Sequence, residues 1–345
     1  MTYPRELNYR MPPEWAPHTR TLISWPIQAS MVYPDDYANV CGGYTQVIRA
    51  IAEFEPVGVV VNAADAEKVR EALHREGPTV HPIELLPIEH NDAWLRDNGP
   101  TFVVNGQGEV AGVNWKFNAW GGKYSPWDLD DAVAPQILEH YGVRRFDAPL
   151  VMEGGSIHVD GEGTLLTTEE CLLNTNRNPE LQREHIEEEL RKFVNIDKVI
   201  WLKRGLDGDE TDGHVDNIAC FAAPGKVIIQ TCYDPSDANY EITQENLSIL
   251  RSTKDAQGRE LQIIELPQPP RVDFEDSRLT LSYLNFYFVN GGIILPIFGG
   301  TAAETDKQAV AALQAAFPER RIRTVDGMAI IKEGGNVHCT TQQMP

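Results

Sequence analysis

Short apolar runs alternate with longer amphipathic stretches along the chain. The apolar runs are rich in valine, isoleucine and leucine, and glycine, proline, asparagine or aspartate often separates them, a pattern typical of strands. The predicted strands cover residues 22–25, 57–61, 101–104, 110–113, 164–167, 199–202, 227–231, 293–297 and 328–331.

The amphipathic stretches repeat apolar side chains at helical spacing and predict helices. These cover residues 44–53, 65–76, 179–193, 241–252 and 303–317. Asn178 and Pro179 supply a start signal for the third helix, as its N-cap and first helical residue. Alternation of strands and helices predicts an α/β fold. Because no long linker interrupts the pattern, we expect residues 1–345 to form a single domain.

Two short motifs recur along the chain. EGGSIH at residues 153–158 is echoed by EGGNVH at 333–338, and HVD at 158–160 is echoed at 214–216. Repeated segments in which a glycine turn precedes a strand suggest structural units arranged about a common centre. Matches this short also arise by chance.

The chain is strongly acidic. It contains 30 lysine and arginine residues against 51 aspartate and glutamate residues, which gives a formal net charge of −21. Such a chain repels nucleic acid and anionic membranes, so we expect neither as a partner, whereas small cations are attracted. The acidity is equally compatible with a contribution to solubility alone.

Cysteine usage and the N-terminus indicate the compartment. The five cysteines form no CxxC pair, which argues against a disulfide framework or a zinc ribbon. The first residues lack the apolar segment of a signal peptide, and no apolar run is long enough to span a membrane. These features predict a cytoplasmic protein.

The segment at 333–339, EGGNVHC, is the strongest candidate for chemistry. The predicted strand at 328–331 leads into two glycines, which allow another group to approach the backbone closely. Cys339 follows, and a thiolate is a strong nucleophile. The alternative is a buried, inert thiol. Glu153 stands before two glycines in the same way, and its alternative role is to cap a turn.

An acidic and aromatic cluster lies at residues 91–100, NDAWLRDNGP. Trp94 and Asp97 together suit a planar cation, because the carboxylate accepts its N–H bonds and the indole covers its face. The alternative is a loop in which Arg96 and Asp97 pair for structural reasons.

A denser cluster lies at residues 207–216, with five carboxylates and one histidine. The segment does not match a calcium-binding loop of the EF-hand type, because Thr211 and Asp212 stand where that loop needs Asp or Asn and then Gly. A zinc site is also disfavoured, because only one histidine is present. If 213–220 is a strand, His214 and Asp216 share one face and could shuttle protons and hold a cation. The alternative is an exposed acidic loop.

Taken together, these motifs resemble the agmatine deiminases of the guanidine-modifying superfamily, a group also described as Porphyromonas-type peptidyl-arginine deiminases. The resemblance runs from about residue 8 to the C-terminus, and Asn98 stands where the family more often has threonine. It is carried by WLRD at 94–97, EGG at 153–155, TDGHVD at 211–216, GGNVHCTTQQ at 334–343, MPPEWAPH at 11–18 and WKFNAWGG at 115–122.

The resemblance implies a pentein fold, an α/β propeller of five ββαβ-type units around a pseudo-fivefold axis with the active site in the central channel. It also implies roles for seven residues. Asp97 and Asp216 would grip a guanidinium, Glu153 and His214 would handle protons and positioning, and Cys339 would attack. Trp94 would line the site, and Glu210 would contact agmatine.

The expected function is hydrolysis of agmatine to N-carbamoylputrescine and ammonia through a covalent amidino-cysteine (thiouronium) intermediate, within putrescine biosynthesis. We expect no metal and no organic cofactor. The expected partner is a small cationic guanidine, and the oligomeric state, including a homo-oligomer, stays open. The acidic residues near His214 favour a substrate with a free ammonium over one with a carboxylate. Two alternatives remain: a deiminase of free or peptidyl arginine, and a non-catalytic polyamine-binding protein.

Overall fold

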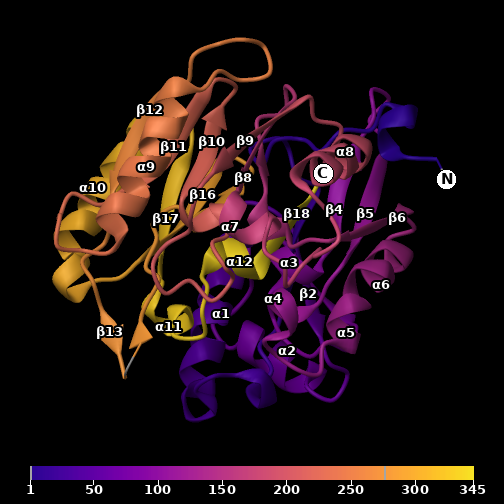
Figure 1. Ribbon diagram of the computed structural model, residues 1–345. Helices are drawn as coiled ribbons and strands as arrows, with labels where there is room; N and C mark the ends of the chain where they lie inside the picture. The colour runs from indigo at the N-terminus through magenta and orange to yellow at the C-terminus, as the bar shows by residue number, and fades with distance from the viewer. Residues whose placement is uncertain (1, 276) are drawn as a thin grey trace.

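The computed structural model describes residues 2–275 and 277–345, and it has a mixed α/β fold (Figure 1). Five sheets of three or four strands account for most of the described strands, and one two-stranded hairpin joins β13 (Asp273–Phe274) to β14 (Ser277–Arg278). The predicted α/β class is therefore confirmed.

The five larger sheets share one pattern. In each, an antiparallel pair is followed by a parallel strand. Four of the sheets are β4 (Thr101–Val104), β5 (Val110–Lys116) and β6 (Arg144–Val151); β7 (His158–Val159), β8 (Thr164–Thr168) and β9 (Lys198–Leu202); β10 (Ala219–Ala223), β11 (Lys226–Thr231) and β12 (Gln262–Pro267); and β15 (Tyr287–Val289), β16 (Gly292–Ile297) and β17 (Arg321–Asp326). The fifth orders β18 (Thr341–Met344), β1 (Arg20–Ser24), β2 (Val57–Val61) and β3 (Ile83–Pro87), so it joins the two ends of the chain.

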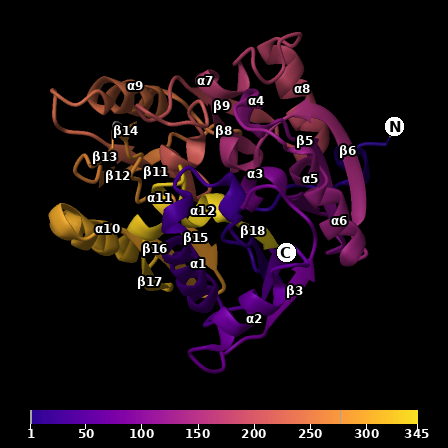
Figure 2. The same ribbon diagram turned by 90° about the horizontal axis from the view of Figure 1, so that it is seen from below.

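Each parallel pair needs a crossover, and a helix supplies it. The crossover helices are α1 (Tyr37–Ile51), α2 (Ala66–His74), α6 (Val133–His140), α8 (Arg183–Val194), α9 (Asn239–Ser252) and α10 (Ala303–Ala316). Viewed from below, α2, α6, α8, α9 and α10 lie around the periphery, and α12 (Val337–Thr340) lies near the middle (Figure 2). The helices therefore cover the outer faces of the sheets and leave the centre to the strand ends.

Short helical turns lie toward this centre. The turns α3 (Leu95–Asn98), η4 (Gly154–Ser156), η5 (Val215–Asn217) and α12 each precede the first strand of a sheet. They contact one another in the order α12, α3, η4, η5. The remaining short helices are η1 (Pro4–Leu7), η2 (Gln28–Ser30), η3 (Pro34–Asp36), α4 (Ala119–Gly122), α5 (Asp128–Asp131), α7 (Glu169–Leu172), η6 (Gly300–Ala302) and α11 (Met328–Ile331).

Two local predictions are wrong. Residues 328–331 form the helix α11 instead of a strand, because Asp326 caps its first turn and Ile331 N donates to Gly327 O. The helix predicted from residue 179 begins at Arg183, since the Asn178 side chain bonds the backbone of Val151. The strand considered as a possibility at 213–220 does not form, because residues 215–217 are the turn η5 and β10 begins only at Ala219.

The apolar core reaches the central turns. Helix α1 buries Val40, Tyr44 and Ile51 on one face, at helical spacing. These side chains belong to the same buried cluster as Trp94 and Cys339. Among residues 2–275 and 277–345, no helix has both the length and the apolar character needed to cross a membrane.

Candidate active site

Cys339 lies in α12, close to two polar side chains from distant parts of the chain. Its sulfur lies 3.4 Å from Asp216 Oδ2 and 3.0 Å from Asn285 Nδ2. The residue is buried, with 5% of its surface exposed. Segments that are 123 and 54 residues from Cys339 in sequence therefore meet at this sulfur.

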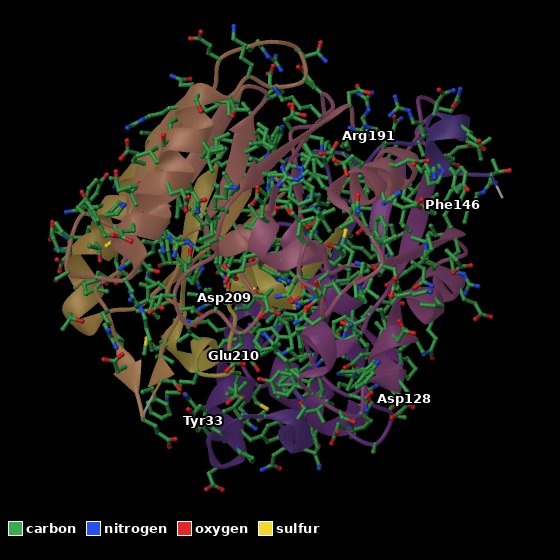
Figure 3. The ribbon with its side chains drawn as sticks, in the orientation of Figure 1. Tyr33, Asp128, Phe146, Arg191, Asp209 and Glu210 are labelled. Carbon is green, nitrogen blue, oxygen red and sulfur yellow. The ribbon has the colours of Figure 1, made fainter. Side chains whose placement is uncertain are left out.

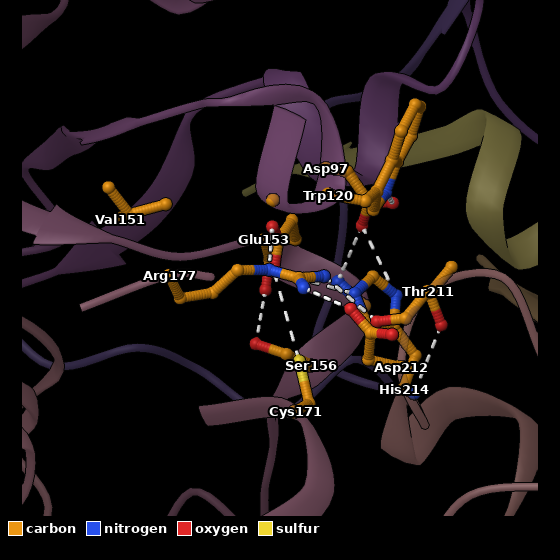
Figure 4. A network of polar contacts seen from close by, with 12 residues as sticks. Asp97, Trp120, Val151, Glu153, Ser156, Cys171, Arg177, Thr211, Asp212 and His214 are labelled. Atoms are coloured by element: carbon orange, nitrogen blue, oxygen red, sulfur yellow. Dashed lines mark hydrogen bonds and ion pairs between the residues drawn. The ribbon is translucent and has the colours of Figure 1, made fainter. Parts of the chain in front are cut away.

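His214, Asp97 and Glu153 form a second buried group (Figure 4). His214 Nδ1 lies 3.8 Å from Asp97 Oδ1, and Nε2 lies 3.5 Å from Glu153 Oε2. Asp97 also accepts hydrogen bonds from Trp120 Nε1 at 2.9 Å and from the backbone N–H of Gly155 at 2.9 Å. The imidazole is thus flanked by two carboxylates, one of which is held by other groups in a fixed orientation.

Gly155 faces the space between these groups. A Cβ at this position would lie 2.6 Å from His214 Nδ1 and 2.9 Å from both Asp216 Oδ2 and Asp97 Oδ1. Real Cβ atoms essentially never come this close to other atoms, so a side chain here would push the polar groups apart. The glycine in the EGG motif is therefore required by the approach of His214, Asp97 and Asp216.

Arg177 links Glu153 to the acidic segment at residues 207–216. Its Nε donates to Glu153 Oε1 at 2.8 Å, and its other nitrogens bond Thr211 O at 2.8 Å and the Asp212 carboxylate. Because the guanidinium is planar and fully charged, it fixes both the carboxylate and the loop. Glu153 Oε2 is left facing His214.

His338 and Glu14 form a further buried network behind Cys339. His338 Nδ1 lies 2.9 Å from Asp216 Oδ2, and Nε2 lies 2.8 Å from Glu14 Oε1. Glu14 also pairs with Arg96 at 3.3 Å. This network orients Asp216 and leaves its Oδ1 buried with no hydrogen-bond partner among the described residues.

The electrostatics of the site set the resting protonation states of Cys339 and His214. Burial raises the pKa of the Cys339 thiol well above its usual value, and the carboxylates of Asp216 and Asp97 raise it further. Burial alone would lower the pKa of His214, but Asp97, Cys171 and Glu153 outweigh it and raise that pKa well above its ordinary value. Without a ligand, the two groups are therefore a thiol and an imidazolium at neutral pH.

The carboxylates differ from one another. Burial acts to raise the pKa of Asp216, but the contact with His338 outweighs it and lowers the pKa. Burial is likewise outweighed at Glu153, where His214 and Arg177 lower the pKa. At Asp97, burial prevails over the attraction of His214 and raises the pKa. The site thus holds two firmly ionised carboxylates and one that is easier to protonate.

A pocket of about 660 Å³, part of it open to solvent, leads down to Cys339. Aromatic rings form part of its wall, and residues of the segment that carries η2 line it as well. The lining residues are Pro26, Ile27, Ser30, Met31, Val32, Val40, Tyr44, Asp92, Ala93, Trp94, Asp97, Trp120, Tyr124, Glu210, Thr211, Glu333, Gly334, Gly335 and Cys339.

Acidic side chains and no basic ones line the described wall of this pocket, and burial raises the pKa of Asp92 to about 7, so this carboxyl is partly protonated at neutral pH. Four carboxylates line it, from Asp92, Asp97, Glu210 and Glu333, and the described residues contribute no lysine, arginine or histidine to its wall. Glu210 and Tyr33 lie near one another in the lower part of Figure 3, at the same end of the molecule. The pocket therefore suits a ligand that carries positive charge and no carboxylate.

One group of described residues has the spacing of metal ligands. Donor atoms of Glu153, Cys171 and His214 lie within 4.8 Å of one another. The Arg177 guanidinium is already bonded to Glu153, and its positive charge disfavours a metal ion beside it.

The structure places the residues that the sequence singles out as follows. Asp97, Glu153, His214, Asp216 and Cys339 meet in the two buried groups, and Trp94 and Glu210 line the pocket above them. The strand geometry considered for His214 and Asp216 is not the one that forms: Asp216 lies in the turn η5, and His214 is the residue directly before that turn. Glu333, the echo of Glu153, lies at the pocket wall and accepts backbone N–H bonds from Val32 and Tyr33.

Sequence reasoning missed several residues of the site. Glu14 and Trp120 lie within motifs that were noted at 11–18 and 115–122, yet nothing local shows that they face His338 and Asp97. Arg177 and Asn285 lie outside every motif considered. Their positions follow only from the packing of distant units.

Comparison with known proteins adds to this geometry. A sequence model of the Porphyromonas-type peptidyl-arginine deiminase family matches residues 10–345. An agmatine deiminase of Ectopseudomonas mendocina is 47% identical over 373 aligned positions, covering 100% of this chain and 97% of the relative. The solved agmatine deiminase of Enterococcus faecalis is 38% identical, with a TM-score of 0.92 over 100% of this chain and 98% of that one. A dimethylarginine dimethylaminohydrolase, at 14% identity and a TM-score of 0.51 over 95% of this chain and all of that one, shares the fold alone.

Proposed function

The chain belongs to the Porphyromonas-type peptidyl-arginine deiminase family, and from that premise we propose that it hydrolyses agmatine to N-carbamoylputrescine and ammonia. The observation that carries the choice of substrate is the pocket above Cys339, where four carboxylates stand and the described lining offers no cation. Agmatine is a dication with no carboxylate. Arginine would have to place its carboxylate among these acids without a positive partner, which is unfavourable.

The guanidinium binds between Asp97 and Asp216. Asp216 Oδ1, which is buried and has no hydrogen-bond partner within the part of the chain that the structure describes, supports this placement, because leaving such an oxygen unpaired is costly and a ligand N–H would satisfy it. Trp94 lies against Gly335 and lines the pocket beside Cys339, so we place the planar cation next to its indole ring. Glu210, at the pocket wall, takes the ammonium end.

Binding of the substrate activates the thiol. The positive charge of the guanidinium offsets the Asp97 and Asp216 carboxylates, so the pKa of the thiol falls and its proton is released to solvent. The Cys339 thiolate then adds to the guanidinium carbon, held in place by the two carboxylates. His214, as imidazolium, gives its proton to the departing nitrogen, the C–N bond breaks and ammonia leaves.

The remaining thiouronium is hydrolysed by the same groups. Neutral His214 takes a proton from water as the water oxygen bonds to the carbon. The carbon–sulfur bond then breaks and restores the thiolate, the hydroxyl proton on the carbon-bound oxygen passes to solvent, and the neutral ureido product is released. Glu153, fixed by Arg177, keeps the imidazole oriented through both steps.

The fold and setting follow from the same proposal. We place the five sheets around a pseudo-fivefold axis in one pentein domain that spans residues 1–345, which their common strand order supports. N-carbamoylputrescine needs only loss of its carbamoyl group to give putrescine, so we place the reaction in putrescine formation.

A product assay tests the proposal. Purified protein is incubated in parallel with agmatine, arginine and an arginyl peptide, and ammonia and ureido products are measured. We expect kcat/KM to be highest for agmatine. A preference for arginine or the peptide would overturn the substrate, and absence of ammonia with all three would favour a polyamine-binding protein.

A further inference from the structure

Asn285 is the neutral side chain that contacts the sulfur of Cys339. It stands two residues before β15, is 1% exposed, and donates from Nδ2 to Cys339 Sγ at 3.0 Å. The other polar side chain on the sulfur is Asp216, whose negative charge opposes ionisation of the thiol.

The orientation of this amide is fixed by its other partners. Asn285 Oδ1 accepts the backbone N–H of His338 at 2.9 Å and of Cys339 at 3.3 Å. Nδ2 also donates to Asn217 Oδ1 at 3.0 Å. A flipped amide would set its N–H groups against two backbone N–H donors, and its oxygen against Asn217 Oδ1. The N–H toward the sulfur is therefore held in advance of the reaction.

We propose that Asn285 is a catalytic residue, which donates a hydrogen bond to the Cys339 sulfur and stabilises the thiolate. The inference rests on the proposed function, because it takes Cys339 as the nucleophile. The thiolate exists before attack on the guanidinium carbon and again when the carbon–sulfur bond breaks. A fixed donor at the sulfur thus assists both steps, and it costs no reorganisation at either.

The test uses Asn285→Asp, which keeps the acceptor for the two backbone N–H groups and removes the donor. Asn336→Asp is the matched control, since Asn336 is equally buried beside α12 but its side chain bonds Gly327 and Val337. Alkylation of Cys339 by iodoacetamide is followed by peptide mass spectrometry across a pH series, without substrate. Ammonia release from agmatine is measured alongside.

In Asn285→Asp we expect the pH midpoint of Cys339 labelling to rise and the thiolate fraction at neutral pH to fall about ten- to a hundredfold. We expect kcat to fall with little change in KM, and Asn336→Asp to show a clearly smaller shift. An unchanged midpoint, equal shifts in both variants, or unchanged kcat would overturn the proposal.

If circular dichroism shows that Asn285→Asp does not fold, the Asn217→Ala variant is used to test the proposal instead. That variant removes the second anchor of Nδ2, and a smaller upward shift of the midpoint is expected, whereas no shift would overturn the proposal. Labelling requires no substrate, so failure of this inference is distinguishable from failure of agmatine as the substrate.

Discussion

Glu210 provides the sharpest test of how the pocket chooses its substrate. Its carboxylate accepts from Tyr124 Oη and lies close to Gly334, five residues before Cys339. An ammonium at about 4 Å would gain at most about 4 kcal/mol at an effective dielectric constant of about 20. Because Glu210 is exposed to solvent, screening reduces this to about 1 kcal/mol. Glu210→Gln should therefore lower kcat/KM for agmatine about fivefold.

The assay compares two substrates. Pentylguanidine has a methyl group in place of the ammonium of agmatine, so it cannot gain from the Glu210 charge. Ammonia release is measured with both substrates and both proteins. We expect the Glu210→Gln variant to keep kcat/KM for pentylguanidine within about twofold of the parent protein. Equal losses with both substrates would show that Glu210 only shapes the loop, and no loss with agmatine would place the ammonium elsewhere.

Three further predictions concern the buried groups. The falling limb of kcat/KM against pH should lie well above the ordinary histidine range, because the raised pKa keeps His214 protonated as pH rises; a limb near pH 6.5 would contradict this. Gly155→Ala should lower kcat by about a hundredfold or more, since its Cβ would displace His214. A near-normal kcat would show that the space between Gly155 and His214 can accept a methyl group. Glu14→Gln should lower the free energy of urea unfolding by about 3–5 kcal/mol, because it weakens the pairing of the buried Arg96, and a loss below about 1 kcal/mol would contradict this.

The inner strands could be predicted from the sequence because they are buried on both faces. The run at 57–61 is β2 without any change of bounds, and all its residues are buried. The edge strands β3, β6, β12 and β17 were missed. Their side chains are largely half-buried or exposed, so their apolar signal is weak. Periodicity therefore found the central strands of the five larger sheets, but of their described edge strands it found only β4 and β9.

Local sequence signals gave wrong secondary-structure predictions where tertiary contacts, or the residues that begin a helical turn, determined the backbone conformation. Asn178 has the character of an N-cap, yet its side chain bonds Val151, which lies 27 residues earlier. The apolar run at 328–331 has the composition of a strand, but Asp326 and Gly327 begin a helical turn there. Composition alone could not decide between these outcomes.

The residues of the site could be predicted from the sequence, but the contacts between them could not. Cys339, His214 and Asp97 stood out as chemical groups beside glycines or acids. The contact of His338 with Asp216 joins positions 122 residues apart, and that of His338 with Glu14 joins positions 324 apart. No spacing rule connects such positions, because they meet only through the packing of separate sheets. The fold therefore sets the relative orientation of these side chains, which the motifs alone do not specify.

The covalent intermediate on Cys339 is the central claim, and mass spectrometry of acid-quenched protein tests it most directly. The protein is mixed with agmatine, quenched within one turnover and digested, and each of the five cysteine positions is analysed. The account predicts an amidino adduct on Cys339 that appears and decays within turnover, and its absence in Cys339→Ser, which should also release no ammonia. Turnover by Cys339→Ser, or an adduct on another cysteine, would contradict it.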